Sequence, residues 1–218
     1  MPRDNFYVAD ESAAGVLAAH AQCGDILLFS TTQIDSYERA SRAFQGAYFP
    51  ADAAAYSHAA IYVGNDEVIH AVPVSKGSNA SGVRIDNLRT PSICVGYVVC
   101  LLRWPAIMPV YANQIEVEAR SLASAGAKYD YGGISGGVWQ TFVDWMQLKP
   151  EQGRRWVDYV HHSSRFAPLY CSKLVLVVYF NALGSVNPLG RGHSRCPIYT
   201  PAEIYCTFAL DDVRIRRT

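Results

Sequence analysis

Short apolar runs in the first half of the chain predict an antiparallel sheet. Residues 26–29 form a continuous apolar run that is typical of a buried strand. Two further β-prone runs, residues 59–63 and 67–71, are separated by Gly-Asn-Asp at 64–66, which supplies the backbone conformations of a tight turn and predicts a hairpin. Additional strands are expected at 82–85 and at 94–102, the latter nearly all apolar and therefore central in its sheet.

The remaining pattern favours helices and loops. Residues 11–22 predict a short helix, and residues 31–56 predict a mobile or partly helical connection over the surface. A helix is expected at 115–125. Further expectations are a Gly/Tyr-rich loop at 128–137, one or two aromatic-bearing helices at 138–162 and a last strand at 207–216.

The apolar run at 171–180 fits two kinds of element. It has the length and composition of a buried strand, but Pro168 before it and residues 181–184 after it frame a buried helix equally well. Periodicity cannot distinguish the two, because both would be apolar on every side. We predict a helix, because a helix would place Cys171 at its N-terminus.

Composition indicates a globular protein and excludes several classes of function. Half of the 218 residues are hydrophobic and 17% are charged, so we expect one folded domain over residues 1–218. Nineteen basic residues balance nineteen acidic ones, which disfavours nucleic-acid binding. The longest apolar stretches fall well short of the roughly 20 residues of a transmembrane helix. Acidic residues near the start also disfavour a secretory signal, so synthesis in the cytoplasm is expected.

The six cysteines are expected to be free thiols, since the chain is long and carries no recognisable export signal. No Cys-x-x-Cys pair occurs, and no histidine or carboxylate stands at ligand spacing from a cysteine, so no metal is expected. The glycines at 132–137 are not followed by the Lys-Ser/Thr of a phosphate loop, and no cofactor is expected.

Two histidines of the predicted hairpin can meet across it. His58 comes just before the first strand's apolar run and His70 lies near the end of the second strand, so antiparallel pairing brings the two side chains together. One neutral imidazole can then hydrogen-bond the other and fix its orientation, as a third residue does behind a catalytic base. Alternatively, they are unrelated polar residues at strand ends.

Cys171 is the candidate nucleophile if the run that it opens is a helix. A thiol at a helix N-terminus faces unpaired N–H groups and the positive end of the helix dipole, which stabilise a thiolate. A nearby His58 would stabilise it further and form, with a polar orienting group, the minimum set for covalent catalysis on a carbonyl. The alternative is a buried structural thiol.

The strand-and-histidine segments resemble one half of the NlpC-type papain-like cysteine hydrolases. In that family the first histidine is the base and the second, twelve residues later, is the orienting group, which is the spacing of His58 and His70. The segments that carry the resemblance are Gly24-Asp25-Ile-Leu-Leu-Phe29, Ser57-His58-Ala-Ala-Ile-Tyr-Val-Gly64, Val68-Ile-His70-Ala71 and Gly82-Val83.

The order of the segments resembles the circularly permuted branch of that family. Here the candidate nucleophile follows the histidines, in Tyr170-Cys171-Ser172-Lys173-Leu174-Val175, as it does in the YiiX-like bacterial proteins and the lecithin:retinol acyltransferase group. Tyr129-Asp130 and Tyr199-Thr-Pro-Ala-Glu-Ile204 also resemble segments of the YiiX-like members. The resemblance covers residues 23–102 and 111–210, with insertions at 31–56 and 132–168.

The resemblance implies an α+β, permuted papain-like fold in which a small antiparallel sheet packs against the helix that begins at Cys171. Cys171 would be the nucleophile, His58 the base and His70 the orienting group. Further candidates for substrate or oxyanion contacts are Tyr129, Tyr131 and Asp25, although the N–H of Cys171 is the expected main oxyanion donor. Lys173 departs from the family pattern, and either assists an anionic substrate or is solvated.

The implied reaction is acyl transfer to water, from the amide bonds of cell-wall peptides. Together with the expected lack of a signal, this suggests a bacterial effector delivered by a specialised secretion system to a target-cell periplasm, with a possible delivery or immunity protein as partner. Two alternatives stay open. One is a lipid-directed acyl hydrolase or acyltransferase of the same fold, with an apolar surface at 138–160, and the other is a non-catalytic binding module.

Overall fold

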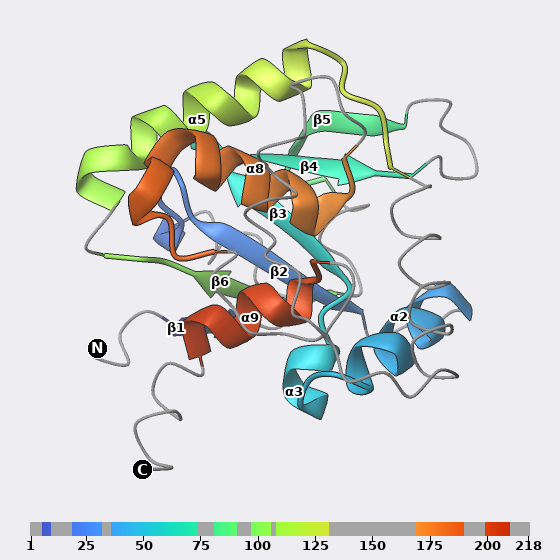
Figure 1. Ribbon diagram of the computed structural model, residues 1–218. Coiled ribbons are helices and arrows are strands. Elements are labelled where there is room, and N and C mark those ends of the chain that lie inside the picture. Colours follow the sequence, from blue (N-terminus) through green and yellow to red (C-terminus); the bar gives the residue numbers. More distant parts are fainter. Residues whose placement is uncertain are drawn as a thin grey trace.

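A six-stranded antiparallel sheet forms the centre of the computed structural model (Figure 1). The structure describes residues 6–9, 19–31, 36–73, 81–90, 97–105, 108–130, 169–189 and 199–209. The strand order is β1-β6-β2-β3-β4-β5, and every neighbouring pair is antiparallel. The strands are β1 (Phe6–Ala9), β2 (Ile26–Thr31), β3 (His58–Tyr62), β4 (Glu67–Val72), β5 (Gly82–Asn87) and β6 (Tyr97–Leu102).

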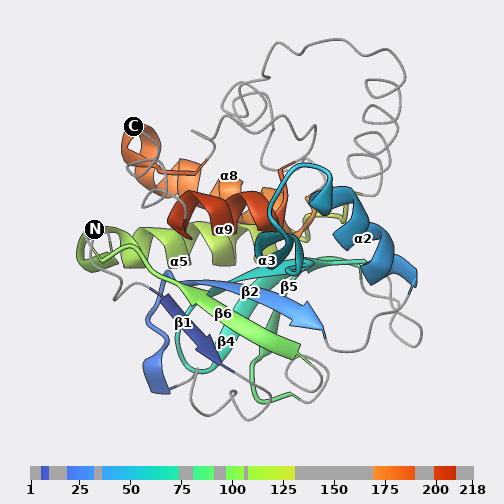
Figure 2. The same ribbon diagram turned by 90° about the horizontal axis from the view of Figure 1, so that it is seen from below.

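Three helices cover one face of this sheet, as Figure 2 shows: α5 (Met108–Ser124), α8 (Cys171–Leu183) and α9 (Pro201–Ala209). The helices α2 (Ser36–Gly46) and α3 (Ala51–Ala54) connect β2 to β3, and a short 3-10 turn, η2 (Gly184–Val186), follows α8. In the described part of the chain, no helix combines the length and the apolar composition needed to cross a bilayer.

The core lies mainly between the sheet and α8. Every residue from Cys171 to Tyr179 is buried, because α8 is apolar on nearly all sides and packs between β3, α5 and α9. Alternate residues of β3 contribute to this core, among them Ala59 and Ile61, whereas Ala60 and Tyr62 belong to a smaller apolar cluster on the opposite face. The apolar helix and the alternating strand are thus packed as their patterns require.

The structure confirms most of the predicted elements. The hairpin is present as β3 and β4, the run at 171–180 is a helix, and β6 lies inside the sheet between β1 and β2. The connection at 31–56 is partly helical, and the helix expected at 115–125 begins earlier, at Met108. Of the helix expected at 11–22 the structure describes residues 19–22, of which 19–20 are helical and 21–22 are not. The helices expected at 138–162 lie outside the described residues.

The strand expected at 207–216 is wrong where the structure describes it, because residues 207–209 belong to α9. The helix begins at Pro201, and the hydroxyl of Thr200 accepts a hydrogen bond from the N–H of Glu203 at 3.2 Å, which caps the helix N-terminus. Thr207 then donates its hydroxyl to the carbonyl of Glu203 at 2.9 Å, within the helix. A helix start six residues upstream therefore outweighs the local β propensity of the tail.

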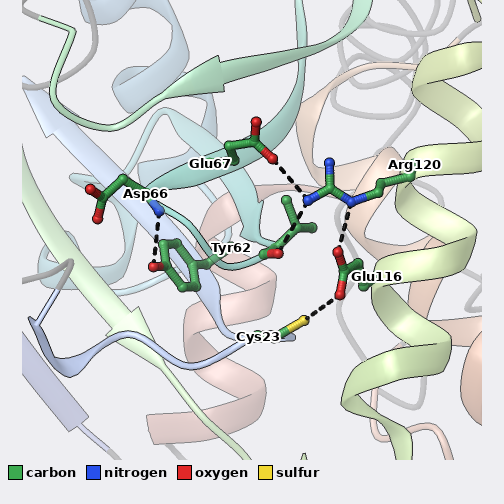
Figure 3. Close-up of polar contacts among 7 residues, drawn as sticks. Cys23, Tyr62, Asp66, Glu67, Glu116 and Arg120 are labelled. Carbon is green, nitrogen blue, oxygen red and sulfur yellow. Dashed lines mark hydrogen bonds and ion pairs between the residues drawn. The ribbon is translucent and has the colours of Figure 1, made fainter.

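A group of polar side chains ties α5 to the β3–β4 hairpin (Figure 3). Arg120 on α5 donates hydrogen bonds to Glu116 at 2.7 Å and to Glu67 on β4 at 2.8 Å. The Cys23 thiol lies 3.5 Å from the other carboxylate oxygen of Glu116. These contacts hold the long helix against the turn end of the hairpin.

Gly82 marks a close approach of two backbones. It opens β5 with φ +122°, and a Cβ built on it would lie 2.4 Å from the carbonyl oxygen of Ala127. The same carbonyl accepts a hydrogen bond from the N–H of Val83 at 2.8 Å. A side chain at position 82 would push β5 away from the backbone of Ala127 and Lys128.

We predict that Gly82→Ala lowers the free energy of unfolding by about 2–3 kcal/mol, from the combined clash and unfavourable φ. Urea unfolding followed by circular dichroism measures this. The matched control is Gly46→Ala, since a Cβ there meets nothing within 4 Å, and its effect should stay within about 1 kcal/mol. Equal midpoints for the two variants would contradict the prediction.

Candidate active site

Three side chains on neighbouring strands form a line of hydrogen bonds. The Nε2 atom of His58, at the start of β3, lies 2.9 Å from Nδ1 of His70 on β4. Nε2 of His70 lies 2.9 Å from Oδ2 of Asp86 on β5. The imidazole rings are nearly perpendicular, with centroids 5.1 Å apart. The predicted meeting of His58 and His70 is confirmed, and the structure adds Asp86 to it.

Strand register brings these residues together. The β3–β4 pairing joins Ile61 to Ile69 and Tyr62 to Val68, which places His58 and His70 beyond that paired stretch. Their side-chain hydrogen bond continues the link between the strands there. On the other side β4 pairs with β5, with Val68 opposite Asp86, so Asp86 is a diagonal neighbour of His70 within reach of its ring.

Asp86 is a functional candidate that sequence reasoning missed. Its carboxylate also accepts a hydrogen bond from Nε of Arg84 at 2.6 Å. Partial burial alone would raise the pKa of Asp86, but the hydrogen bonds and charges of His70 and Arg84 lower it below the usual value of 3.8. The alternation of Arg84 and Asp86 along a strand was the available signal, although it does not reveal which β4 residue they face.

Cys171 is the first residue of α8 and lies beside the start of β3. Tyr170 precedes it in extended conformation, at φ −101° and ψ 169°. Burial raises the pKa of the Cys171 thiol, whereas hydrogen bonds from the backbone of Ala59 and of Ser172 oppose that shift. Since Ala59 follows His58 directly, its contact places the sulfur next to the segment that carries the histidine line.

The helix start is held by segments distant in sequence. Leu169 pairs with residues 128–130, its N–H donating to the carbonyl of Lys128 at 2.8 Å and its carbonyl accepting from the N–H of Asp130 at 3.1 Å. The hydroxyl of Ser172 donates to the carbonyl of Tyr199 at 2.7 Å. The backbone on both sides of Cys171 is therefore fixed.

Burial controls the charges of the candidate dyad. It lowers the pKa of His58 to about 3, and the charges of His70 and Arg84 lower it in the same direction. Because burial also raises the pKa of Cys171, both groups are neutral in the free protein at neutral pH. The preformed thiolate expected from the sequence is thus wrong for the free protein, since desolvation outweighs the helix N–H groups.

Lys173 is neither solvated nor available to an anionic substrate. Its ammonium forms a buried ion pair with the Asp130 carboxylate at 3.0 Å, and the side chains are 4% and 13% exposed. This pair joins the first turn of α8 to the segment after α5. Both readings of Lys173 from the sequence are therefore replaced by a structural one.

Of the other residues proposed to contact substrate, Tyr129 lies near the start of α8 and Asp25 does not. Tyr129 is buried and pairs with Leu169, which stands two residues before Cys171. Asp25 is fully buried at the far end of β2, where it pairs with Arg103 at 2.7 Å, whereas Phe29 is the β2 residue opposite His58. The structure therefore does not bring Asp25 to the dyad. Tyr131 and the aromatic segment 138–160 lie outside the described residues.

Four cysteines are described, and all four are free thiols. Burial raises the pKa of Cys23, Cys100 and Cys206 to about 12 in each case. The Cys23 thiol contacts Glu116 (Figure 3). Within the described ranges, no cluster of three histidine, cysteine or carboxylate side chains could hold a metal ion.

Comparison of the chain with protein-family models, curated proteins and solved structures found no match in any of the three.

The low pKa of His58 predicts a loss of stability in mild acid. The unfolded chain takes up a proton near pH 6.5, but folded His58 does not, so the stability that depends on neutral His58 is complete above that pH and falls below it. Relative to His58→Gln, the protein should lose at most about 1.4 kcal/mol per pH unit between about pH 6.5 and pH 4.

Urea unfolding of both proteins across this range measures the difference. A difference in free energy that stays constant with pH would show that His58 titrates equally in the folded and unfolded states.

Proposed function

We propose that this protein is a cysteine hydrolase in which Cys171 is the nucleophile and His58 the general base. The observation that carries the proposal is the line His58–His70–Asp86, which starts one residue from the backbone N–H that contacts the Cys171 sulfur. A structural thiol needs no such line of polar groups on the strand that it contacts. A base backed by two further polar groups is the usual arrangement behind an activated nucleophile.

The reaction starts from the neutral pair. The Cys171 thiol attacks the carbonyl carbon of an amide or ester while its proton passes to His58, so the C–S bond forms as the carbonyl becomes an oxyanion. Collapse of this intermediate breaks the bond to the leaving group, which takes the proton from His58. Water then attacks the thioester with His58 again as base, releasing the acid and restoring the thiol.

Backbone N–H groups at the helix start suit the developing oxyanion. The N–H groups of the first turn of α8 have no partner within the helix, and the N–H groups of Ala59 and Ser172 already lower the pKa of Cys171. The imidazolium that forms at His58 is stabilised through His70, with the charge of Asp86 behind it. Charge therefore develops only during the reaction, at positions with prepared partners.

The permuted papain-like fold is part of this proposal. An antiparallel sheet that carries both histidines, followed by a helix that opens with the cysteine, has the segment order of the permuted NlpC-type proteins. By the same resemblance we propose the amide bonds of peptidoglycan peptides as substrate and the periplasm of a target cell as the place of action. A delivery or immunity protein would then be a partner.

Acylation of Cys171 tests the chemistry. With p-nitrophenyl acetate we expect a thioester at Cys171, detected by peptide mass mapping, and its formation should be about 100-fold slower or more in His58→Gln. Cys171→Ala should abolish the burst of p-nitrophenol.

Cys206 provides an internal control, because its thiol is more exposed than that of Cys171. Preferential labelling of the less exposed thiol indicates activation, whereas labelling that follows exposure would favour a binding module. Cys206→Ala should leave the burst unchanged.

Expression in a bacterial periplasm tests the substrate. With an added export signal, the protein should cause lysis and release shortened wall peptides, and Cys171→Ala should do neither at the same protein level. Released peptides are identified by chromatography and mass spectrometry. Lysis by both proteins would show that Cys171 does not cause it, and lysis by neither while Cys171 is acylated in vitro would direct the search to lipid acyl groups instead.

A further inference from the structure

We propose that Asp86 is a positioning residue that sets the tautomers of both histidines and thereby makes Nδ1 of His58 the basic nitrogen. This inference rests on the proposed function for its catalytic meaning, but the tautomers can be measured independently of any reaction. It follows from the direction in which each hydrogen bond of the line must run.

The first step is at Asp86. An ionised carboxylate only accepts hydrogen bonds, and the pKa of Asp86 is held low by His70 and Arg84 despite partial burial. The ring atom that faces it at 2.9 Å, Nε2 of His70, must therefore carry the proton. In neutral His70 the other nitrogen, Nδ1, is then an acceptor.

The second step passes this direction to His58. Nδ1 of His70 lies 2.9 Å from Nε2 of His58, so His58 must donate through Nε2. Neutral His58 then keeps an unprotonated Nδ1, which is the nitrogen left for a substrate or thiol proton. One carboxylate thus decides the chemistry of a ring two hydrogen bonds away.

The surroundings favour this single arrangement. His70 is 4% exposed, so bulk water competes little for its nitrogens. The His58 ring also lies against the Phe29 ring, with centroids 5.7 Å apart, which limits its rotation. The charged groups on β5 that act on the line are Arg84 and Asp86, and Cys171 of α8 contacts the backbone of Ala59, next to His58. Arg84 donates a hydrogen bond to Asp86, and its charge helps to keep that carboxylate ionised.

A purely structural role for Asp86 makes a different prediction. The Arg84–Asp86 pair alone could stabilise β5, and its loss would then change stability but not the histidine tautomers. The experiment must therefore read the tautomers directly.

Two-bond ¹H–¹⁵N correlation spectra of the ¹⁵N-labelled protein near neutral pH report the tautomer of each histidine. His58→Gln and His70→Gln assign the two rings. We expect both rings as the Nε2–H form. In Asp86→Asn we expect a mixture, because the amide at position 86 can present either an acceptor or a donor to His70. Acylation of Cys171 should slow about 10- to 100-fold, as when outer partners of functional histidines are removed.

The matched control is Asp66→Asn. Asp66 forms an ion pair with Arg89 at 2.5 Å and is 21% exposed, against 25% for Asp86. Its loss should change neither tautomer nor the acylation rate. An Nδ1–H form of His58 in the parent protein, or unchanged tautomers in a folded Asp86→Asn, would overturn the inference. Should Asp86→Asn not fold, the spectrum of the parent protein decides alone.

The two proposals fail separately. Nε2–H tautomers without acylation of Cys171 would leave the assignment to Asp86 intact and remove the hydrolase function. Acylation that depends on His58, together with an Nδ1–H form of His58, would do the reverse.

Discussion

Burial of α8 on all sides is the constraint on which the candidate site depends. A helix without a polar face must be enclosed, and β3, α5 and α9 enclose it here. Enclosure fixes the helix axis and therefore the position of Cys171 at its start. It also desolvates the sulfur, so the same packing that places the Cys171 thiol raises its pKa. The position of the Cys171 sulfur and its raised pKa therefore have the same cause.

The polar residues around this core compensate for that burial. Lys173 is neutralised by Asp130, and Ser172 is bonded to the carbonyl of Tyr199, so the first turn of α8 contains paired polar groups. Across the sheet, the line from His58 to Asp86 serves a similar purpose where β3 and β4 no longer pair. In the proposed mechanism, neutral Cys171 and His58 with an ionised carboxylate behind them can hold a proton transiently without a permanent buried charge.

Much of the fold could be predicted from the sequence because its signals are local. The Gly-Asn-Asp turn and its flanking β-prone runs specify the hairpin, and with it the approach of His58 and His70. The cysteine at the head of an apolar run specified a helix once its chemistry was considered. The strand prediction for 207–216 was wrong at 207–209 for the opposite reason. The residues that start and cap α9 lie upstream of the run from which the strand was predicted.

By itself, the sequence determined the hairpin, the histidine pair and the helix that begins at Cys171, because each depends on residues within a few positions of one another. Only the tertiary structure decided that Asp86 faces His70. This contact depends on the register of β5 against β4, which the connection between the two strands does not fix. The tertiary structure alone paired Lys173 with Asp130 and gave Cys171 and His58 the buried surroundings that keep both neutral. Charge states depend on desolvation, which the packing of distant segments creates.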